Sequence, residues 1–456
     1  MALYRVGEVV LSKALKQKGS VKNLVFASKY RNVKELYALV CETLKYSEVL
    51  DEIFVSSKFF KHCKGLSKPL AKLLVYDFLF GKGIQCSGKY KRAVMANKSS
   101  LQSTLARIKM KKKIITNAEL ITDPIANVKI PKYLRVNTLK TTLKSVTNCL
   151  KSEGYNLFEG NWKKMGIKEF KIDEHIDNLL VFNDKVNFHK HDLYLNGHLI
   201  FQDKASCIPA QVLNPQSNQT VIDACAAPGN KTSHLSSLMN NTGTIYAFDL
   251  DLKRIRTMKT LLDRAGVANC EVTQSNFLHV KKDDLKYKDV RYILVDPSCS
   301  GSGMVQRLSH LTDNAESSSD KRLSSLSKFQ LQVLNHALSF PQVERVAYST
   351  CSIHDIENED VVKQALANNS KFKLVKCLPT WTRRGHALKG FTDEAEMCVR
   401  CQPELDGTNG FFIALFERTQ SSVICPAEHV QAKLIRPRKR KPRKSNGKTD
   451  SNKIKV

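Results

Sequence analysis

The chain of 456 residues lacks the features that would place it in a membrane or outside the cell. No apolar run reaches the length of about 18 residues that a membrane-spanning helix needs. The first twenty residues have neither the compact apolar core nor the cleavage site of a secretory signal peptide. We therefore expect the thirteen cysteines to be thiols in a reducing compartment, and their odd number fits a full disulfide framework poorly.

Acidic residues are scarce. The chain has 43 Asp and Glu against 73 Lys and Arg, a formal net charge of +30, and residues 82–118 contain no acid at all. Such an excess favours a polyanionic partner through counterion release, so nucleic acid is the leading candidate. No amphipathic basic helix or lipidation motif supports a membrane partner. Residues 82–118 are either a solvated surface or an RNA-facing one.

Composition and periodicity divide the chain into four parts. Apolar residues at helical spacing predict a helical N-terminal domain over 1–125, whose C-terminal part is basic. Residues 126–210 have mixed patterns and predict a small α+β segment. Residues 211–420 alternate strand and helix patterns, which predicts a parallel sheet covered on both faces. Residues 421–456 are a basic tail, typical of nuclear localisation or RNA binding, and cannot bury a core.

Within the third part, strands are expected at six places, and the segment 317–325 is expected to be a mobile loop. The expected strands are 220–226, 243–251, 270–276, 292–298, 345–351 and 410–418. Folds of this kind bind ligands at the carboxyl ends of their parallel strands.

The first two strand ends are typical of a nucleoside-binding site. VIDACAAPGNKTSHL carries a Pro–Gly turn immediately before a helix start, and Asp249 ends the next strand about 20 residues later. An acid there can accept hydrogen bonds from ribose hydroxyls. The segment has a single glycine, so it matches neither the dinucleotide fingerprint nor a P-loop. A strand–turn–helix without a ligand is the alternative interpretation of this segment. A nucleoside cofactor without a pyrophosphate cradle, such as S-adenosylmethionine, fits.

Two further strand ends carry thiols. YILVDPSCSGSG delivers Asp296 and Cys299, and VAYSTCSIHDIENED delivers Cys351. A free cysteine considered alone is most often a buried core residue. Here both thiols are expected at the same sheet edge as the nucleoside-binding segments, which favours a role in chemistry.

The motifs DACAAPGNKT, FDLD, DPSCSGSG and YSTCSIHDIENED resemble those of the Sun-domain family of RNA cytosine carbon-5 methyltransferases. RVNTLK, GHLIFQDKAS and GFFIALFER also match, so the resemblance covers about residues 130–420 and is closest to the subfamily acting on large-subunit ribosomal RNA. It implies a Rossmann-like class I methyltransferase sheet, a helical N-terminal domain and a small α+β RNA-binding segment. It also implies S-adenosylmethionine as cofactor, RNA as partner, and ribosome biogenesis in the nucleus, most specifically the nucleolus.

The resemblance assigns roles to residues. Cys351 is implied as the nucleophile that adds to carbon 6 of cytosine, Cys299 as the group that assists product release, and Asp296 as a contact to the cytosine ring. Asn276 stands where the family often has an aspartate that contacts adenine, so its amide would accept that bond without charge assistance. The implied cofactor-binding residues are Cys225, Ala226, Ala227, Pro228, Gly229, Asn230, Lys231, Asp249, Arg254, Asn276 and Asp296.

Three alternatives stay open. A DNA cytosine methyltransferase would use the cysteine of the Asp296 motif as nucleophile, and Cys351 argues against it. A non-enzymatic ribosome-assembly factor could retain the same fold. Cys398 and Cys401 form a lone CxxC, and without a second pair nearby we expect no structural metal. Asn358 is expected to support the loop around Cys351.

Overall fold

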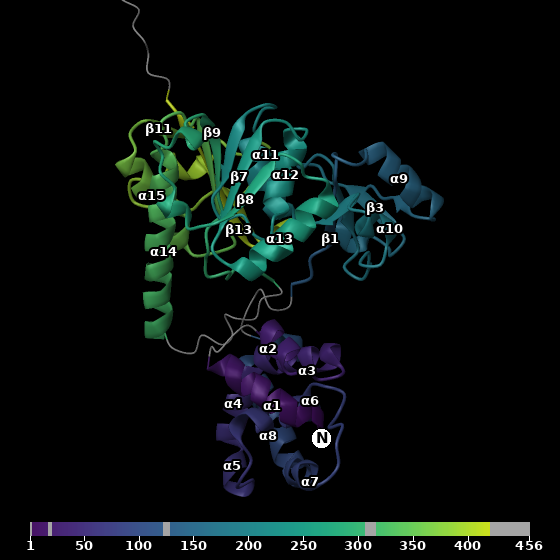
Figure 1. Cartoon of the computed structure of the whole chain (residues 1–456). Helices are drawn as coiled ribbons and strands as arrows, with labels where there is room; N and C mark the ends of the chain where they lie inside the picture. Colours follow the sequence, from purple (N-terminus) through teal and green to yellow (C-terminus); the bar gives the residue numbers. More distant parts are fainter. Residues whose placement is uncertain (1, 17–20, 122–127, 306–315, 420–456) are drawn as a thin grey trace, which may run out of the picture. The chain divides into compact units, whose positions relative to one another are not determined.

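The computed structural model describes residues 2–16, 21–121, 128–305 and 316–419, with no side chains described for 316–319 (Figure 1). The predicted basic tail, 421–456, lies outside the described residues. No helix within the described ranges combines the length and apolar character needed to cross a membrane.

The N-terminal part is helical, as predicted. Its helices enclose their own hydrophobic core, which includes the fully buried Tyr4, Leu36 and Leu73. The acid-free segment forms α7 and α8, and most of its basic side chains, such as Lys91 and Lys111, are exposed. The helices are α1 (Ala2–Leu15), α2 (Val21–Ala27), α3 (Val33–Lys45), α4 (Ser47–Ser56), α5 (Phe59–His62), α6 (Lys68–Leu79), α7 (Lys89–Ala96), α8 (Lys98–Lys112) and the short η1 (Ala118–Leu120).

A small five-stranded sheet follows, with strand order β2-β3-β4-β1-β5. Its core includes Leu134, Phe170 and Phe182, all fully buried. This is the mixed α+β segment that the sequence predicts. The elements are β1 (Lys132–Val136), α9 (Leu143–Ser152), β2 (Asn156–Leu157), η2 (Trp162–Lys164), β3 (Glu169–Ile172), β4 (Leu179–Phe182), α10 (Asp192–Leu195) and β5 (Leu199–Phe201).

The largest sheet has the order β11-β13-β10-β9-β6-β7-β8, with β12 paired to β13. All the predicted strands are present. Its elements up to β9 are α11 (Lys204–Leu213), β6 (Thr220–Asp223), α12 (Asn230–Leu238), β7 (Thr244–Asp249), α13 (Leu252–Ala265), β8 (Cys270–Gln274), η3 (Phe277–His279), η4 (Leu285–Tyr287) and β9 (Val290–Val295). The later elements are α14 (Glu316–Leu338), β10 (Arg345–Thr350), η6 (Asp355–Glu357), α15 (Glu359–Asn368), β11 (Phe372–Val375), η7 (Ala395–Met397), β12 (Val399–Cys401), α16 (Pro403–Asp406) and β13 (Phe411–Arg418).

The prediction of a wholly parallel sheet is wrong for the last strands. β6 to β10 are parallel, but β13 runs antiparallel to β10, β11 and β12. Between β12 and β13 lies only the four-residue helix α16, which is too short for the crossover that a parallel neighbour needs, so these two strands pair antiparallel. The chain extends from β6 outward to β8 and then returns to β9 on the other side of β6. This reversal creates a crevice at the carboxyl ends of β6 and β9.

Both faces of the sheet are covered, as predicted (Figure 1). Successive strand residues point to opposite faces, so Val346 and Tyr348 enter one core with α14 and α15, while Ala347 enters the other with α11 and α12. Helix α13 packs on the second face near β7 through Met258 and Leu262. Packing on both faces fixes the strand ends that carry the motifs.

The segment 317–325, predicted as a mobile loop, instead lies within the 23-residue helix α14. Serine-rich composition suggested a loop, but the segment contains no glycine or proline to stop a helix. Farther along α14, Val333, Leu334 and Ala337 are buried against the sheet and hold the helix in place. Packing of this face outweighs the modest helix propensity of serine.

Candidate active site

Four motif-bearing strand ends meet at one edge of the large sheet. β6 ends at Asp223 and β7 at Asp249, while β9 and β10 lead directly into Asp296 and Cys351. These strands are parallel neighbours in the order β10-β9-β6-β7. The predicted convergence of the motifs is therefore present.

The two thiols are in contact, with Cys299 Sγ and Cys351 Sγ 3.0 Å apart. The hydrogen bond with Cys351, followed by burial, raises the pKa of the Cys299 thiol well above its ordinary value. The Cys299 thiol is therefore harder to ionise than an ordinary cysteine. The contact places the two thiols within direct reach of one another.

Close backbone packing holds the loops that carry the two thiols together. Gly303 N–H donates to the Cys351 carbonyl at 3.0 Å, and Gly410 N–H donates to the Gly303 carbonyl at 2.8 Å. A Cβ on Gly303 would lie 2.1 Å from the carbonyl oxygen of Gly410, so only glycine fits there. The second glycine of SGSG is required for this approach.

Asp296 links the thiols to the predicted cofactor segment. Its Oδ1 accepts from Ser349 Oγ at 2.7 Å, and its Oδ2 accepts from Lys231 Nζ at 2.7 Å. Burial would lower the pKa of Lys231, but the charge of Asp296 and this hydrogen bond raise it instead. Lys231 is therefore a fixed positive charge beside the carboxylate and near the Cys351 sulfur.

These groups line a cavity of about 720 Å³. Its volume lies within the usual range of about 300–1,000 Å³ for ligand pockets, so it has room for a nucleoside and a base. Among the lining residues are Cys225, Lys231, Arg254, Asp296, Cys299 and Cys351.

The predicted cofactor loop is tied to the end of β7. Asp249 Oδ2 accepts from the Ala227 N–H at 3.1 Å, and Oδ1 accepts from the Asp251 N–H at 3.0 Å. Arg254 donates to the Ala227 carbonyl, and its Nη1 lies 3.4 Å from Asp249 Oδ2. Asp251 caps helix α13, the alternative to ribose binding that its position suggests. Asp249 is thus held in place beside the loop.

The Pro–Gly turn positions the start of helix α12. Gly229 has φ +100°, a left-handed conformation that suits glycine, and a Cβ there would lie 2.9 Å from Met258 Cγ. The peptide bond between Ala227 and Pro228 is cis. Asn230 donates to the Phe201 carbonyl at 3.2 Å and lines the cavity, whereas Ala226, Ala227, Pro228 and Gly229 form the turn behind it.

Asn276 does not line the cavity. Its side chain accepts from the Leu278 N–H at 3.1 Å and caps the short helix η3. Because this bond already engages the amide oxygen, the structure gives Asn276 a local structural role. Its predicted contact with adenine stays a prediction.

Glu357 is a central residue of this site that sequence reasoning missed. The side chain is fully buried and accepts from the Ser300 N–H at 2.9 Å, Ser300 Oγ at 2.6 Å, Gln330 Nε2 at 2.9 Å and Ser352 Oγ. Ser300 follows Cys299 and Ser352 follows Cys351, so one carboxyl group ties both thiol loops together. The only sequence signal was an acid near a helix start, which predicts a solvated N-terminal turn instead.

Asn358 supports the same loop, as predicted. Its Oδ1 accepts from Thr350 Oγ1, and its Nδ2 donates to the Ser352 carbonyl at 3.0 Å. Both partners flank Cys351. The thiol therefore sits on a short loop whose backbone is fixed on both sides.

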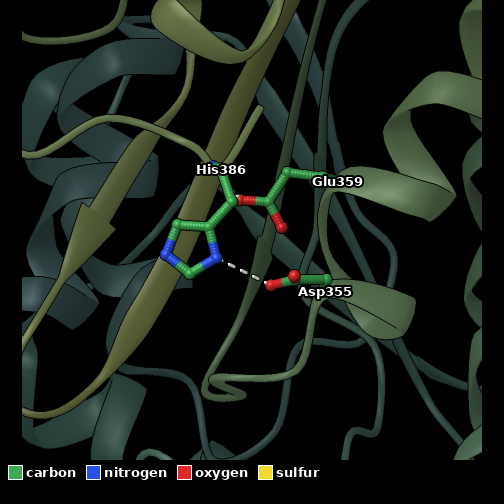
Figure 2. Close-up of side chains that lie close together, drawn as sticks. All are labelled: Asp355, Glu359 and His386. Carbon is green, nitrogen blue, oxygen red and sulfur yellow. Dashed lines mark hydrogen bonds and ion pairs between the residues drawn. The ribbon is translucent and has the colours of Figure 1, made fainter. Parts of the chain in front are cut away.

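Beyond this loop, Asp355, Glu359 and His386 form a compact cluster (Figure 2), in which His386 Nδ1 lies 2.9 Å from Asp355 Oδ1. Such a group could hold a metal ion, but Arg400 already binds both carboxylates, at 2.6 Å from Asp355 Oδ1 and 2.6 Å from Glu359 Oε1. Arg400 also donates to the Ile353 carbonyl at 2.8 Å. The cluster is an ion-pair network that anchors the loop after Cys351.

The CxxC pair is split between two cores. Cys398 packs among the residues under α14 and α15, while Cys401 packs on the opposite face of the sheet. Burial raises the pKa of each thiol well above its ordinary value. The two sulfurs serve as small apolar core groups on opposite faces of the sheet.

The strand order, the antiparallel β13 and the motif-bearing strand ends define a Rossmann-like class I methyltransferase fold, as predicted. A solved structure of a methyltransferase homologue from Pyrococcus horikoshii shares this fold, with a TM-score of 0.53, 24% identity, and coverage of 82% of this chain and 99% of that one. The chain belongs to the NOL1/NOP2/Sun domain family, which the motif resemblance predicted.

Family descriptions match three consecutive regions. They are "NOL1/NOP2/Sun domain family member 5, N-terminal domain" over 34–121, the "ferredoxin-like domain" of that member over 130–202, and "16S rRNA methyltransferase RsmB/F" over 210–417. A "28S rRNA (cytosine-C(5))-methyltransferase" of Mus musculus is 43% identical and covers 97% of each chain. A "25S rRNA (cytosine-C(5))-methyltransferase" of Schizosaccharomyces pombe is 39% identical and covers 91% of each chain.

Proposed function

We propose that this protein transfers a methyl group from S-adenosylmethionine to carbon 5 of a cytosine in large-subunit ribosomal RNA. The activities for which its relatives are named support the reaction and the RNA class. The observation that carries the proposal is the pair of contacting thiols at the sheet edge that holds the predicted cofactor loop.

The residues present fit the cofactor. Lys231 and Arg254 give the cavity wall positive charge, Asp249 is held beside the loop as an acceptor for ribose, and the start of helix α12 suits a carboxylate. When bound, S-adenosylmethionine supplies a methyl group on a positively charged sulfur. The predicted set from Cys225 to Lys231, with Asp249, Arg254, Asn276 and Asp296, is proposed to hold it.

The chain itself contributes the covalent chemistry. The Cys351 thiolate forms a bond to carbon 6 of cytosine, and the electrons displaced toward carbon 5 make that carbon nucleophilic. Asp296, fixed by Lys231 and Ser349, contacts the cytosine ring and stabilises the adduct. Once carbon 5 carries the methyl group, a base takes its proton and the electrons of that C–H bond re-form the double bond between carbons 5 and 6. The bond from sulfur to carbon 6 then breaks to release the Cys351 thiolate, and Cys299 assists this release. The target base must leave its stack to reach the cavity.

A trapping experiment tests these roles. Cys299→Ala should accumulate a covalent protein–RNA adduct that survives denaturing electrophoresis, and the double variant with Cys351→Ala should form none. Methylation of RNA by the Cys351→Ala variant would contradict the assignment. If the roles followed the DNA methyltransferase pattern, Cys299→Ala would abolish the adduct, and competition between DNA and RNA substrates would confirm that pattern.

Isothermal titration with S-adenosylmethionine separates the enzyme from a ribosome-assembly factor on the same fold. Binding supports the enzyme, and its absence favours the scaffold. Bisulfite mapping of ribosomal RNA with and without the protein would identify the modified cytosine.

The finer assignments are also proposals. The protein is proposed to act in ribosome biogenesis on ribosomal RNA or pre-ribosomes in the nucleus, most specifically the nucleolus. The four-part division at 1–125, 126–210, 211–420 and 421–456 is proposed as the domain organisation, with 126–210 contacting RNA. Fluorescence microscopy of the tagged full chain tests the location, since exclusion from the nucleus would contradict it.

A further inference from the structure

Both tryptophans of the chain line one cavity outside the active site. Trp162 and Trp381 border a space of about 490 Å³ between the small sheet and the segments near α16. Trp162 is half-buried, whereas Trp381 is 4% exposed and donates through Nε1 to the Arg400 carbonyl at 2.9 Å. Trp162 also packs on Gly407, where a Cβ would lie 2.7 Å from its Nε1. Two rigid aromatic walls are therefore fixed in one recess.

Buried charged groups line the same cavity. Lys204 Nζ lies 2.7 Å from Asp173 Oδ2, and these side chains are only 6% and 4% exposed. Lys204 also lies 5.2 Å from the centre of the Trp381 ring and 3.1 Å from His175 Nδ1. Because an ammonium group only donates, His175 Nδ1 accepts and the ring proton is on Nε2. Burial, followed by the charge of Lys204, lowers the pKa of His175, so the ring is neutral.

The cavity carries a small positive excess. Lys204 is paired with Asp173, and Arg383 binds Asp406 at 2.8 Å. Two further lysines, Lys163 and Lys171, remain in the lining against one unburied acid, Glu174. This excess disfavours a cationic ligand such as a methylated ammonium group, although aromatic walls alone would suit one.

The cavity lies next to the active site along the chain. Asp203 lines the active-site cavity and the next residue, Lys204, lines the tryptophan cavity. On a second segment, Asp406 lines the tryptophan cavity and Asn409 the active-site cavity. Asp203 Oδ1 accepts from Thr408 Oγ1 at 2.6 Å, which joins the two segments. The two cavities are therefore lined by neighbouring residues of the same two segments.

We propose that the tryptophan cavity binds one unstacked nucleotide of the RNA substrate, with its base against Trp162 and its phosphate near Lys163 and Lys171. The inference rests on the proposed function only in taking RNA as the substrate. Single-stranded RNA is recognised by stacking splayed-out bases on aromatic side chains, with basic groups along the backbone. The volume suits one nucleotide. The site positions the strand whose target cytosine enters the active-site cavity.

Intrinsic tryptophan fluorescence reports on this cavity, because both tryptophans line it. The full-length protein is titrated with a mixed-sequence single-stranded RNA oligonucleotide and, separately, with heparin, a polyanion without bases. We expect saturable quenching by RNA and none by heparin. Equal quenching by heparin, or no quenching when labelled RNA is bound by anisotropy, would overturn the proposal.

Matched variants sharpen the test. Trp162→Ala should weaken RNA binding by about 5- to 150-fold, the measured span for loss of one base–aromatic stack, and Trp162→Phe should restore most of it. Lys163→Ala should weaken binding more than Lys190→Ala, because both lysines are exposed but only Lys163 lines the cavity. Equal effects of the two lysine variants, or wild-type binding by Trp162→Ala, would contradict the site.

Two readouts separate this inference from the proposed function. Unchanged S-adenosylmethionine affinity of Trp162→Ala shows that the methyltransferase domain is folded. Quenching by RNA with no methyl transfer would contradict the proposed reaction and support the nucleotide site. Methyl transfer with unaltered KM for RNA in Trp162→Ala would contradict the site and leave the reaction standing.

Discussion

Replacing Glu357 tests whether one buried carboxyl group holds the two loops that carry Cys299 and Cys351. The side chain accepts four hydrogen bonds, from the Ser300 N–H, Ser300 Oγ, Ser352 Oγ and Gln330 Nε2. In Glu357→Gln, the amide oxygen can serve the Ser300 N–H and Gln330 Nε2, and the new NH₂ group faces the two serine hydroxyls, which can turn to accept from it. Four hydrogen bonds to a carboxylate then become neutral ones, each roughly 0.5–1 kcal/mol weaker, so the variant should lose about 2–4 kcal/mol of unfolding free energy.

The same change should displace the thiols. A misplacement of about 1 Å can cost on the order of 100-fold in rate, and we expect the adduct with RNA to form 10- to 100-fold more slowly, an order-of-magnitude figure. S-adenosylmethionine affinity should not change, because Glu357 takes no part in the hydrogen bonds that hold Lys231, Asp249 and Arg254. If Glu357 only kept the domain folded, Glu357→Gln would weaken S-adenosylmethionine binding and adduct formation together.

The assays are urea unfolding, isothermal titration with S-adenosylmethionine, and single-turnover trapping of the adduct. Glu344→Gln is a matched control because it removes a carboxylate that pairs with Arg291 at the surface, where both side chains are more than 40% exposed. It should cost less than about 1 kcal/mol. Wild-type stability together with a wild-type trapping rate in Glu357→Gln would refute the role assigned to this residue.

Three further predictions concern other parts of the same domain. Gly229→Ala should weaken S-adenosylmethionine binding by titration and lower stability by about 1–3 kcal/mol, because of its φ of +100° and the approach to Met258; unchanged affinity would contradict this. Arg400→Met should cost about 3–5 kcal/mol in urea unfolding by leaving the fully buried Glu359 without its partner, and adding Glu359→Leu should recover much of that loss. Burial, followed by the charge of a nearby arginine, lowers the pKa of His234 well below its ordinary value, so only the unfolded chain gains this proton as pH falls below about 6.5. Stability relative to His234→Gln should therefore fall by up to about 1.4 kcal/mol per pH unit below that point, and a pH-independent difference in urea unfolding would contradict it.

The sequence predicts the strand ends well because each motif joins an apolar run, which predicts a strand, to polar or cysteine residues directly after that run. Asp296 and Cys351 follow strands whose successive side chains enter two opposite cores. This packing on both faces fixes the two residues at the sheet edge. Family resemblance then supplies the roles that burial patterns alone could not.

Other features depend on contacts between distant residues, which local patterns do not encode. Glu357 resembles an ordinary helix-start acid until Ser300, 57 positions away, is brought against it. The segment 317–325 of helix α14 is predicted as a loop because its serines give no sign of the buried face that Val333 and Leu334 form farther along the helix. The antiparallel β13 and the cavity shared by Trp162 and Trp381 likewise arise only from tertiary packing.

The position of β13 has a consequence for the order of events during synthesis. β10 delivers Cys351, yet its outer edge is covered by residues 411–418, which leave the ribosome long after it. Until they arrive, β10 presents an unpaired strand edge of the kind that recruits other chains. The nascent domain is therefore most exposed to aggregation after Cys299 and Cys351 have been made and before β13 has arrived, which is when chaperone protection should matter most.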